Sequence, residues 1–456
     1  MDTATAARVV AGRQLGANVR FLRVTTDSRA LRDGDLFVAL KGERFDGHDF
    51  VPAALAHGAV AALVDDARAP SLPGPLVAVA DPLAALGALA ANWRARFALP
   101  LALVVGSNGK TTVKEMLAAI LRAQLGADAV LATEGNLNNA IGLPLTLLRL
   151  TDAHRAAAVE LGMNHRGETR TLAAVAQPTI VVVTNAQREH QEFMASVAEV
   201  ASEHADAVAA LPRDGVAVVN ADDAHAGVWR GTAERAGARV TTFGLDAPAD
   251  VRAEAQPRDD GSDLALATPL GTVRVALAVP GRHMARNAAA ATAAAIAAGV
   301  ALPAVAAGLA GFRAVPGRLV ALRAANGARV LDDTYNANPD SMRAAIDVLA
   351  AAPGTRFLAM GDMGEVGADG PQFHREIGAY ARERGVARLY ALGGAARDAV
   401  AAFGAGAAHF DSADALAAAV ARDAGEGVVV LVKGSRFMRM ERVVAALTGG
   451  AAGGAH

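Results

Sequence analysis

The sequence predicts an α/β protein with three domains, the central one built on a mostly parallel sheet of the P-loop type. Strand-like runs of aliphatic residues alternate with Ala-rich helical runs, which is typical of parallel sheets covered by helices. The chain has 456 residues, and at about 150 residues per domain this length favours three domains. The wholly apolar strand LALVVG, at 101–106, has the composition of a strand buried on both faces of such a sheet.

The first domain is expected at residues 1–98. Short strands are predicted at 36–40 (LFVAL) and 61–66 (AALVDD), and a helix through Trp93 ends the domain. The break at Leu99–Pro100 separates this small α/β unit from the rest of the chain, because a proline does not continue a helix.

The second domain is expected at residues 99–314. After the apolar strand, further strands are predicted at 156–162, 179–185 and 215–223. The segment 244–275 is less hydrophobic and alternates polar with apolar residues, which predicts antiparallel strands. This domain should therefore carry a parallel sheet with an antiparallel extension.

The third domain is expected at residues 315–456, where the strand–helix pattern starts again. Its strands are predicted at 330–333, 357–362, 389–394 and 428–435, each separated from the next by a helical run. The pattern is Rossmann-like, but it lacks the G-x-G-x-x-G fingerprint of dinucleotide-binding domains.

Composition and charge exclude several classes of function. The 44 basic and 46 acidic side chains give a formal charge of −2, so no basic field is present to hold nucleic acid or an anionic membrane. The absence of cysteine excludes disulfides, Cys-ligated zinc, iron–sulfur clusters and a Cys nucleophile. The first 20 residues lack a secretory h-region, and the uncharged stretch 288–312 is predicted to form two buried Ala-rich helices broken at 299–303. We therefore expect a cytoplasmic protein without membrane insertion.

The strongest local motif is GSNGKTT, which follows the apolar strand and opens the helical run VKEMLAAIL. Glycines allow a tight turn in which backbone N–H groups and the helix N-terminus face phosphate oxygens. Lys110 would reach the β- and γ-phosphates, and the Thr111 hydroxyl would bind Mg²⁺. The loop is one residue shorter than the usual P-loop, and the alternative is an ordinary strand–helix turn. The residues predicted to bind the nucleotide are Gly106, Ser107, Asn108, Gly109, Lys110, Thr111 and Thr112.

Two more residues are candidates for a Mg²⁺ site. Glu160 ends the strand AAAVELG, and the carboxyl ends of parallel strands face the ligand crevice. Carboxylate oxygens are ligands that Mg²⁺ prefers, although a helix-capping role is the alternative. His190 follows the next strand and could reach the same edge, but the residues alone favour a structural histidine.

Motifs along nearly the whole chain, taken together, resemble those of the Mur ligases, which build the peptide stem of bacterial peptidoglycan. In chain order they are GSNGKTT, ATEGNLNNAIGLPLTLL, VELGMNHRGE, NADD, PGRHMARNAAAA, VPGRL, DDTYNANPDSM, LGG and VKGSRF. Residues 26–51 (TDSRALRDGDLFVALKGERFDGHDFV) and DDTYNANPDSM are most similar to the members that add D-alanyl-D-alanine to UDP-N-acetylmuramoyl-tripeptide. DDTYNANPDSM discriminates best, because the sister ligases carry a different sequence, with histidine, at that point.

The resemblance implies both a fold and a reaction. It implies an N-terminal UDP-sugar-binding domain, a central ATP-binding domain and a C-terminal Rossmann-like ligase domain. It also implies an ATP-dependent amide ligase that uses Mg²⁺ and an acyl-phosphate intermediate at the last cytoplasmic step of the peptide stem. The partners would be UDP-N-acetylmuramoyl-tripeptide and D-alanyl-D-alanine, and we expect a monomer.

The resemblance further implies roles for individual residues. Lys110, Glu160, His190 and Arg318 would be catalytic, and His190 would join Thr111 and Glu160 as a Mg²⁺ ligand. The residues implied to contact adenine, phosphates and ribose are Asn287, Arg318 and Asp333, with an interdomain ion pair as the alternative for Arg318. The residues implied to face the substrates are Asp27, Ser28 and Arg29 for the UDP end, and Asn139, Asn336, Ser341 and Lys433.

One stretch departs from the family pattern. Many Mur ligases carry a carboxylated lysine about a dozen residues after the metal-binding histidine, but residues 190–208 contain no lysine. A carboxylate could replace it, and Glu203 is expected to do so, with His204 and Asp206 behind it. The alternative is an exposed helix here, with water completing the metal shell.

The motifs leave two alternative functions, one in the same class of enzyme and one in another class. The first is a related ATP-driven amide ligase, such as a folylpolyglutamate synthase or another Mur enzyme. The segment LFVALKGERFDGHDF argues against the folate enzyme, which lacks a UDP-sugar domain. A P-loop regulatory ATPase or kinase would not explain the joint occurrence of NANPDSM and KGSRF.

Overall fold

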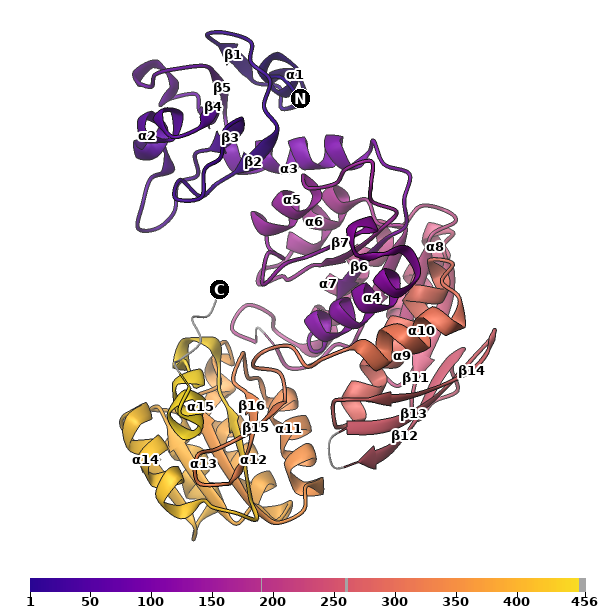
Figure 1. Ribbon diagram of the computed structural model, residues 1–456, viewed down its shortest axis with the longest axis vertical. Helices are drawn as coiled ribbons and strands as arrows, with labels where there is room; N and C mark the ends of the chain where they lie inside the picture. The colour runs from indigo at the N-terminus through magenta and orange to yellow at the C-terminus, as the bar shows by residue number, and fades with distance from the viewer. Residues whose placement is uncertain (190, 259–260, 451–456) are drawn as a thin grey trace.

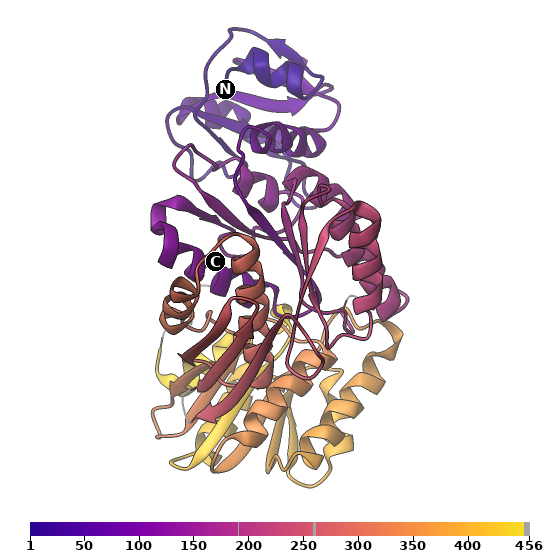
Figure 2. The same cartoon turned by 90° about the vertical axis from the view of Figure 1, so that its right-hand side faces the viewer.

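The computed structural model describes residues 1–189, 191–258 and 261–450, whose strands form three sheets, one in each domain. The N-terminal domain lies at one end of the long axis of the molecule and the C-terminal domain at the other (Figures 1 and 2). The prediction of a three-domain α/β fold is confirmed. The boundaries after residues 98 and 314 stay predictions, although none of the three described sheets crosses them.

The N-terminal domain carries a five-stranded sheet in the order β1-β5-β4-β3-β2, parallel except for β1. The sequence predicted β3 and β4 but not β5, although β5 (LVAV) is wholly apolar and buried. The helices are α1 (Thr3–Val9), α2 (Val51–Ala56) and α3 (Pro82–Arg94). The strands are β1 (Arg13–Leu15), β2 (Arg23–Thr25), β3 (Asp35–Val38), β4 (Ala59–Asp65) and β5 (Leu76–Val79).

The central domain carries a nine-stranded sheet in the order β14-β13-β12-β11-β10-β9-β6-β8-β7. It is parallel from β7 to β12, and β12 to β14 form the antiparallel extension expected from the alternating pattern. The strands are β6 (Leu101–Val105), β7 (Val130–Ala132), β8 (Ala156–Glu160), β9 (Ile180–Val183), β10 (Val216–Asn220), β11 (Arg239–Gly244), β12 (Val251–Arg258), β13 (Gly261–Thr268) and β14 (Gly271–Leu277).

Helices cover both faces of this central sheet. On one face α4 packs against α9 and α10, which are the two Ala-rich helices predicted from the uncharged stretch. On the other face α6, α7 and α8 pack in sequence. The helices are α4 (Lys110–Leu125), α5 (Gly142–Leu147), α6 (Glu168–Ala176), α7 (Val197–Ala209), α8 (Ala226–Ala236), α9 (Arg282–Ala297) and α10 (Leu302–Gly311). Because both faces are covered, β6, β8 and β9 are completely buried and are apolar almost throughout.

The C-terminal domain carries a six-stranded sheet in the order β15-β16-β20-β17-β18-β19, parallel except for β15. The strands are β15 (Val320–Arg323), β16 (Arg329–Asp333), β17 (Thr355–Gly361), β18 (Arg388–Leu392), β19 (Ala407–Phe410) and β20 (Val428–Lys433). The helices are α11 (Pro339–Ala351), α12 (Gly370–Glu383), α13 (Ala396–Phe403), α14 (Ala413–Asp423) and α15 (Glu441–Thr448). None of the helices in the described part of the chain is both long and apolar enough to span a membrane.

Arg94, at the end of α3, ties the N-terminal domain to the central one. It is 4% exposed, and its guanidinium donates to the carbonyls of Phe97 (2.5 Å), Leu99 (3.4 Å), Ala176 (3.2 Å) and Gln177 (3.2 Å). Burial lowers the pKa of this arginine. These hydrogen bonds from a buried cation fix the angle at which α3 meets the central domain.

We expect Arg94→Ala to lower the free energy of unfolding by about 2–4 kcal/mol, because it leaves buried carbonyls without donors. Chemical denaturation measures this loss. The control is Arg96→Ala, because Arg96 is exposed and its cation–π contact with Trp93 at 4.4 Å should contribute under about 1 kcal/mol. Equal losses in the two variants would contradict the anchoring role of Arg94.

Candidate active site

Three adjacent strands of the central sheet place the candidate residues at one edge. In the order β9-β6-β8, the P-loop follows β6, Glu160 ends β8 and Asn185 follows β9. The strands are parallel, so their carboxyl ends meet at the same edge of the sheet. Segments that lie about 25 residues or more apart in the sequence are thereby brought together.

Two glycines of the P-loop have no room for a side chain. Gly106 (φ +130°) and Gly109 (φ +88°) both have backbone conformations that residues with a Cβ rarely adopt. A Cβ at Gly106 would lie 2.0 Å from Thr184 Oγ1, and one at Gly109 would lie 2.6 Å from Asn287 Oδ1. The loop therefore packs tightly against the end of β9 and against α9, and α4 begins directly at Lys110.

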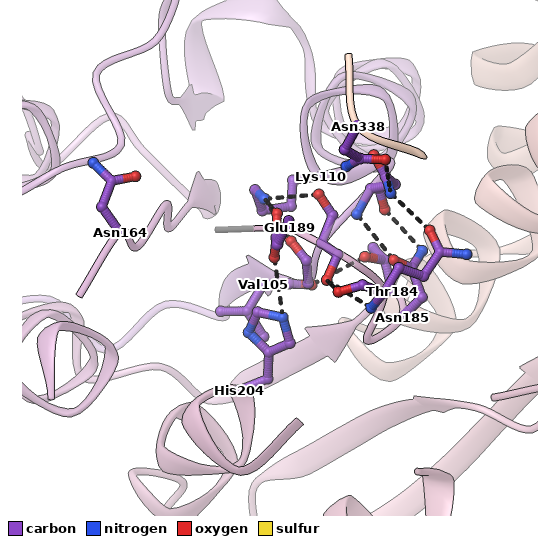
Figure 3. A network of polar contacts seen from close by, with 12 residues as sticks. Val105, Lys110, Asn164, Thr184, Asn185, Glu189, His204 and Asn338 are labelled. Carbon is purple, nitrogen blue, oxygen red and sulfur yellow. Dashed lines mark hydrogen bonds and ion pairs between the residues drawn. The ribbon is translucent and has the colours of Figure 1, made fainter. Parts of the chain in front are cut away.

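Lys110 turns back onto its own loop. Its Nζ donates to the carbonyl oxygens of Gly106 (2.5 Å) and Ser107 (3.2 Å) and lies 3.6 Å from Glu189 Oε2 (Figure 3). The ammonium group thus stays at the mouth of the loop, where the N–H groups at the start of α4 also point. This is the place where an anion such as a phosphate would bind.

Glu160 is buried (3% exposed) and only partly hydrogen-bonded. Asn138 Nδ2 donates to its Oε1 at 2.7 Å, whereas Oε2 is buried without a hydrogen-bond partner among the described residues. An unsatisfied carboxylate oxygen at the edge next to the P-loop strand fits a divalent cation. The residues described contain no group of three His, Asp or Glu side chains that could hold a metal alone, so nucleotide phosphates would have to complete such a site.

The C-terminal domain contributes to the same site. Arg318 Nη2 donates to Thr111 Oγ1 at 2.9 Å, and its guanidinium lies over the Tyr335 ring at 4.3 Å. Arg318 Nε is buried without an acceptor in the described chain. Asp333 and Lys433 end the neighbouring strands β16 and β20, and their side chains pair at 2.5 Å.

A cleft of about 130 Å³ separates the P-loop from these C-terminal residues. The sequence-predicted residues that line it are Asn108, Gly109, Thr112, Asn287, Arg318, Asp333, Ser341 and Lys433. His283, one turn before Asn287 on α9, also lines it. Burial lowers the pKa of His283 to about 4, and Lys433 adds to this effect while Asp333 opposes it. The imidazole is therefore neutral at physiological pH.

Comparison with known proteins agrees with this architecture. Residues 20–94, 104–295 and 317–436 match, in turn, the families described as "Mur ligase family, catalytic domain", "Mur ligase middle domain" and "Mur ligase, glutamate ligase domain". Over 451 residues the chain is 40% identical to the UDP-N-acetylmuramoyl-tripeptide–D-alanyl-D-alanine ligase of Escherichia coli K12, with 96% of each chain covered. The chain belongs to the Mur ligase family.

Solved structures of Mur ligases have the same fold. A crystal structure of MurF from Acinetobacter baumannii superposes with a TM-score of 0.89 at 33% identity, covering 98% of both chains. MurF ligase from Thermotoga maritima, solved in complex with ADP, gives a TM-score of 0.81 at 26% identity, covering 93% of this chain and 96% of that one.

Several predicted substrate residues of this Mur ligase make local contacts that the sequence did not reveal. The Asn139 carboxamide oxygen accepts from the N–H groups of Ile141 and Gly142 at the start of α5. The Ser341 hydroxyl completes a capping box with Asn338 at the start of α11. The Asn336 side chain is exposed and accepts from the next N–H of the chain. Their roles toward substrate stay predictions.

The loop predicted to bind the UDP end folds back on itself. The side chain and backbone N–H of Arg29 donate to Asp27 at 2.9 Å, and they hold the pKa of the Asp27 carboxyl below its usual range. Ser28 lies between them and is partly exposed. A larger cleft, about 490 Å³, lies elsewhere in the N-terminal domain, and its lining includes Lys41, Asp46, His48 and Arg68 as well as Ile141 of the central domain.

The structure corrects the prediction for the stretch without lysine. The Glu203 carboxylate accepts from the backbone N–H groups of Gly167 (2.9 Å) and Thr169 (3.0 Å) and so caps α6, and Asp206 pairs with Arg170. Glu203 is therefore a capping residue rather than a substitute for the carboxylated lysine. Of the three candidates, His204 is the one directed toward the P-loop (Figure 3). His190, the predicted metal ligand, lies outside the described residues.

Sequence reasoning missed the loop after β9, which joins the P-loop to the C-terminal domain. Arg188 binds Asp340 with both Nε (3.2 Å) and Nη2 (2.7 Å), and its Nη1 donates to Glu376 at 2.8 Å. The amides of Asn108 and Asn338 donate to each other at 3.3 and 3.0 Å. No local signal marks such contacts, because their partners lie about 150 residues or more apart in the chain.

We expect Arg188→Ala to loosen the contact between the central and C-terminal domains of this Mur ligase, because the bidentate pair with Asp340 is mostly buried. Small-angle scattering should show a larger radius of gyration for the ligand-free variant. Arg375→Ala, which breaks a pair with Asp398 inside the C-terminal domain, is the control and should leave it unchanged. An unchanged radius in both variants would argue against a role in closure.

The pKa of His283 predicts a titration that NMR can follow. Its signal, assigned by its loss in His283→Gln, should titrate near pH 4, well below the ordinary 6.5. The unfolded chain then binds this proton more readily than the folded one, so the contribution to the free energy of unfolding falls as the pH drops from about 6.5 to about 4. A midpoint near 6.5 would show that the ring is not desolvated.

Proposed function

We propose that the chain is an ATP-dependent ligase that joins D-alanyl-D-alanine to UDP-N-acetylmuramoyl-tripeptide in the synthesis of peptidoglycan. The observation that carries this proposal is the shared cleft, in which the P-loop of the central domain faces Arg318, Asp333 and Lys433 of the C-terminal domain. The relatives that match along nearly the whole chain carry this activity in their names, which supports the same reaction here.

The reaction has two steps, because a carboxylate does not react with an amine unaided. The terminal carboxylate of the tripeptide attacks the γ-phosphorus of ATP, so that an acyl phosphate forms and ADP leaves. The free amine of the dipeptide then attacks the acyl carbon, an amide forms, and phosphate departs with the C–O bond electrons. The first step brings an anion to a polyanion, where two unit charges at 4 Å repel by about 4 kcal/mol at an effective dielectric near 20.

Lys110 and the loop N–H groups offset this repulsion. Lys110 Nζ would leave the Gly106 and Ser107 carbonyls to contact the β- and γ-phosphates, while the N–H groups at the start of α4 hold the same oxygens. Arg318 would direct its unsatisfied Nε toward the nucleotide. Positioning and electrostatic stabilisation therefore account for most of the catalysis.

Glu160 and Thr111, together with the predicted ligand His190, would hold Mg²⁺. When bound, the cation neutralises phosphate charge and helps to orient the reacting groups. Asn138 keeps Glu160 facing this edge, because it donates to one of the two carboxylate oxygens.

The flanking domains would hold the two other substrates. The N-terminal domain, with the loop at Asp27–Arg29 and the cleft beside His48, would bind the nucleotide end of the UDP-sugar. The C-terminal domain, through Asn336, Ser341 and Lys433, would receive the dipeptide. Closure of this domain onto the P-loop would exclude water, which otherwise hydrolyses the acyl phosphate.

Release of phosphate tests the proposed reaction. With ATP and Mg²⁺, we expect rapid release only when UDP-N-acetylmuramoyl-tripeptide and D-alanyl-D-alanine are both present. Phosphate release that needs neither substrate would indicate a regulatory ATPase instead. Release with a folate and glutamate would indicate the other ligase class.

We expect Lys110→Ala to lower turnover by at least a factor of about 100, because the two other lysines near the loop are engaged elsewhere. Lys433 pairs with Asp333, and Lys114 is fully buried and bound to Glu115 and to the Thr133 carbonyl. Steady-state assays measure the loss, and circular dichroism should show an unchanged fold. Turnover above about a tenth of wild type, a loss under about 1.4 kcal/mol, would contradict the phosphate-binding role.

A further inference from the structure

His204 is a buried polar side chain that the proposed reaction does not use. It lies in the middle of α7 and is 2% exposed, and neither ring nitrogen has a hydrogen-bond partner in the part of the chain that the structure describes. Burying an imidazole in this way lowers stability compared with an apolar residue of similar size. The role of His204 must therefore come from the group that it faces.

That group is the carboxylate of Glu189, on the loop after β9. His204 Nε2 lies 3.6 Å from Glu189 Oε1, and Lys110 Nζ lies 3.6 Å from Glu189 Oε2. The three side chains form a line from α7 to the P-loop helix (Figure 3). The side chains of His204, Glu189 and Lys110 are 2%, 9% and 17% exposed, so water and salt screen the charges of Glu189 and Lys110 weakly.

Glu189 influences what the empty P-loop can bind. Lys110 Nζ is held by two loop carbonyls and by this carboxylate, so a nucleotide must draw the ammonium group away from Glu189. When a nucleotide without a divalent cation draws Lys110 away, its phosphates come close to the Glu189 carboxylate, and the two anions repel each other. A divalent cation that arrives with the phosphates offsets this repulsion.

We propose that Glu189, kept in place by His204, is a positioning residue that makes the P-loop discriminate against nucleotide lacking its divalent cation. The proposal rests on the proposed function, because it assumes that the P-loop binds ATP. His204 acts only through Glu189: its Nε2 faces Oε1 at 3.6 Å, and this polar contact keeps the carboxylate directed at Lys110.

The test is the affinity for ADP, measured by calorimetry in EDTA and in excess Mg²⁺. We expect Glu189→Gln to bind ADP about tenfold more tightly than wild type in EDTA, and within about threefold of wild type in Mg²⁺. Glu192→Gln is the matched control, because this carboxylate lies on the same loop but is exposed. It should leave both affinities unchanged.

His204→Leu tests the positioning role, and its apolar side chain suits the buried site. In EDTA it should bind ADP more tightly than wild type, but the gain should be smaller than in Glu189→Gln. In the Glu189→Gln background, His204→Leu should change the ADP affinity by less than about twofold, because His204 acts on the nucleotide through Glu189. Unchanged affinity in His204→Leu, or full additivity in the double variant, would overturn the role of His204.

Two results would overturn the role of Glu189. Unchanged ADP affinity of Glu189→Gln in EDTA would show that the carboxylate does not weaken the binding of nucleotide that lacks a divalent cation. Weaker binding confined to Mg²⁺ would show that Glu189 is instead a metal ligand. Failure of the proposed function would look different, because it would show as phosphate release that does not depend on the two substrates. Failure of nucleotide binding itself would show as a wild type that binds no ADP in Mg²⁺.

Discussion

The carboxyl edge of the central parallel sheet is the constraint on which the site depends. Strands β9, β6 and β8 are adjacent and wholly buried, so their register determines where the P-loop, Glu160 and the loop after β9 emerge. A shift of β8 by one residue would turn Glu160 to the opposite face of the sheet. Helices on both faces leave this edge as the place where polar groups of the central sheet can meet a ligand.

The tight packing of the P-loop extends this constraint into the C-terminal domain. Gly109 lies against Asn287, Asn108 exchanges hydrogen bonds with Asn338, and Thr111 accepts from Arg318. Each of these contacts places a residue of another element within reach of the loop. The nucleotide site is therefore shared between two domains, and coupling between their positions and the bound ligand follows from this arrangement.

The sequence predicted those features whose signal is local. The apolar strands and the P-loop were found because burial on both faces and glycine-rich turns leave continuous patterns of residues. Short strands such as β1 and β7 were missed, since three residues carry no periodicity. The capping role of Glu203 and the contact of Arg188 with Asp340 could not be found, because both depend on which segments meet in space. Family resemblance supplied Arg318 and Asp333, which local physics alone would not have selected.

The most direct test of the shared nucleotide site is a crystal structure with Mg²⁺ and a non-hydrolysable ATP analogue. The phosphates should accept hydrogen bonds from the N–H groups of residues 107–112, with Lys110 Nζ moved from the Gly106 carbonyl to the β- and γ-phosphates. Arg318 should contact the nucleotide from the C-terminal domain. Nucleotide bound away from this loop, or bound with Arg318 out of reach, would contradict a site built from both domains.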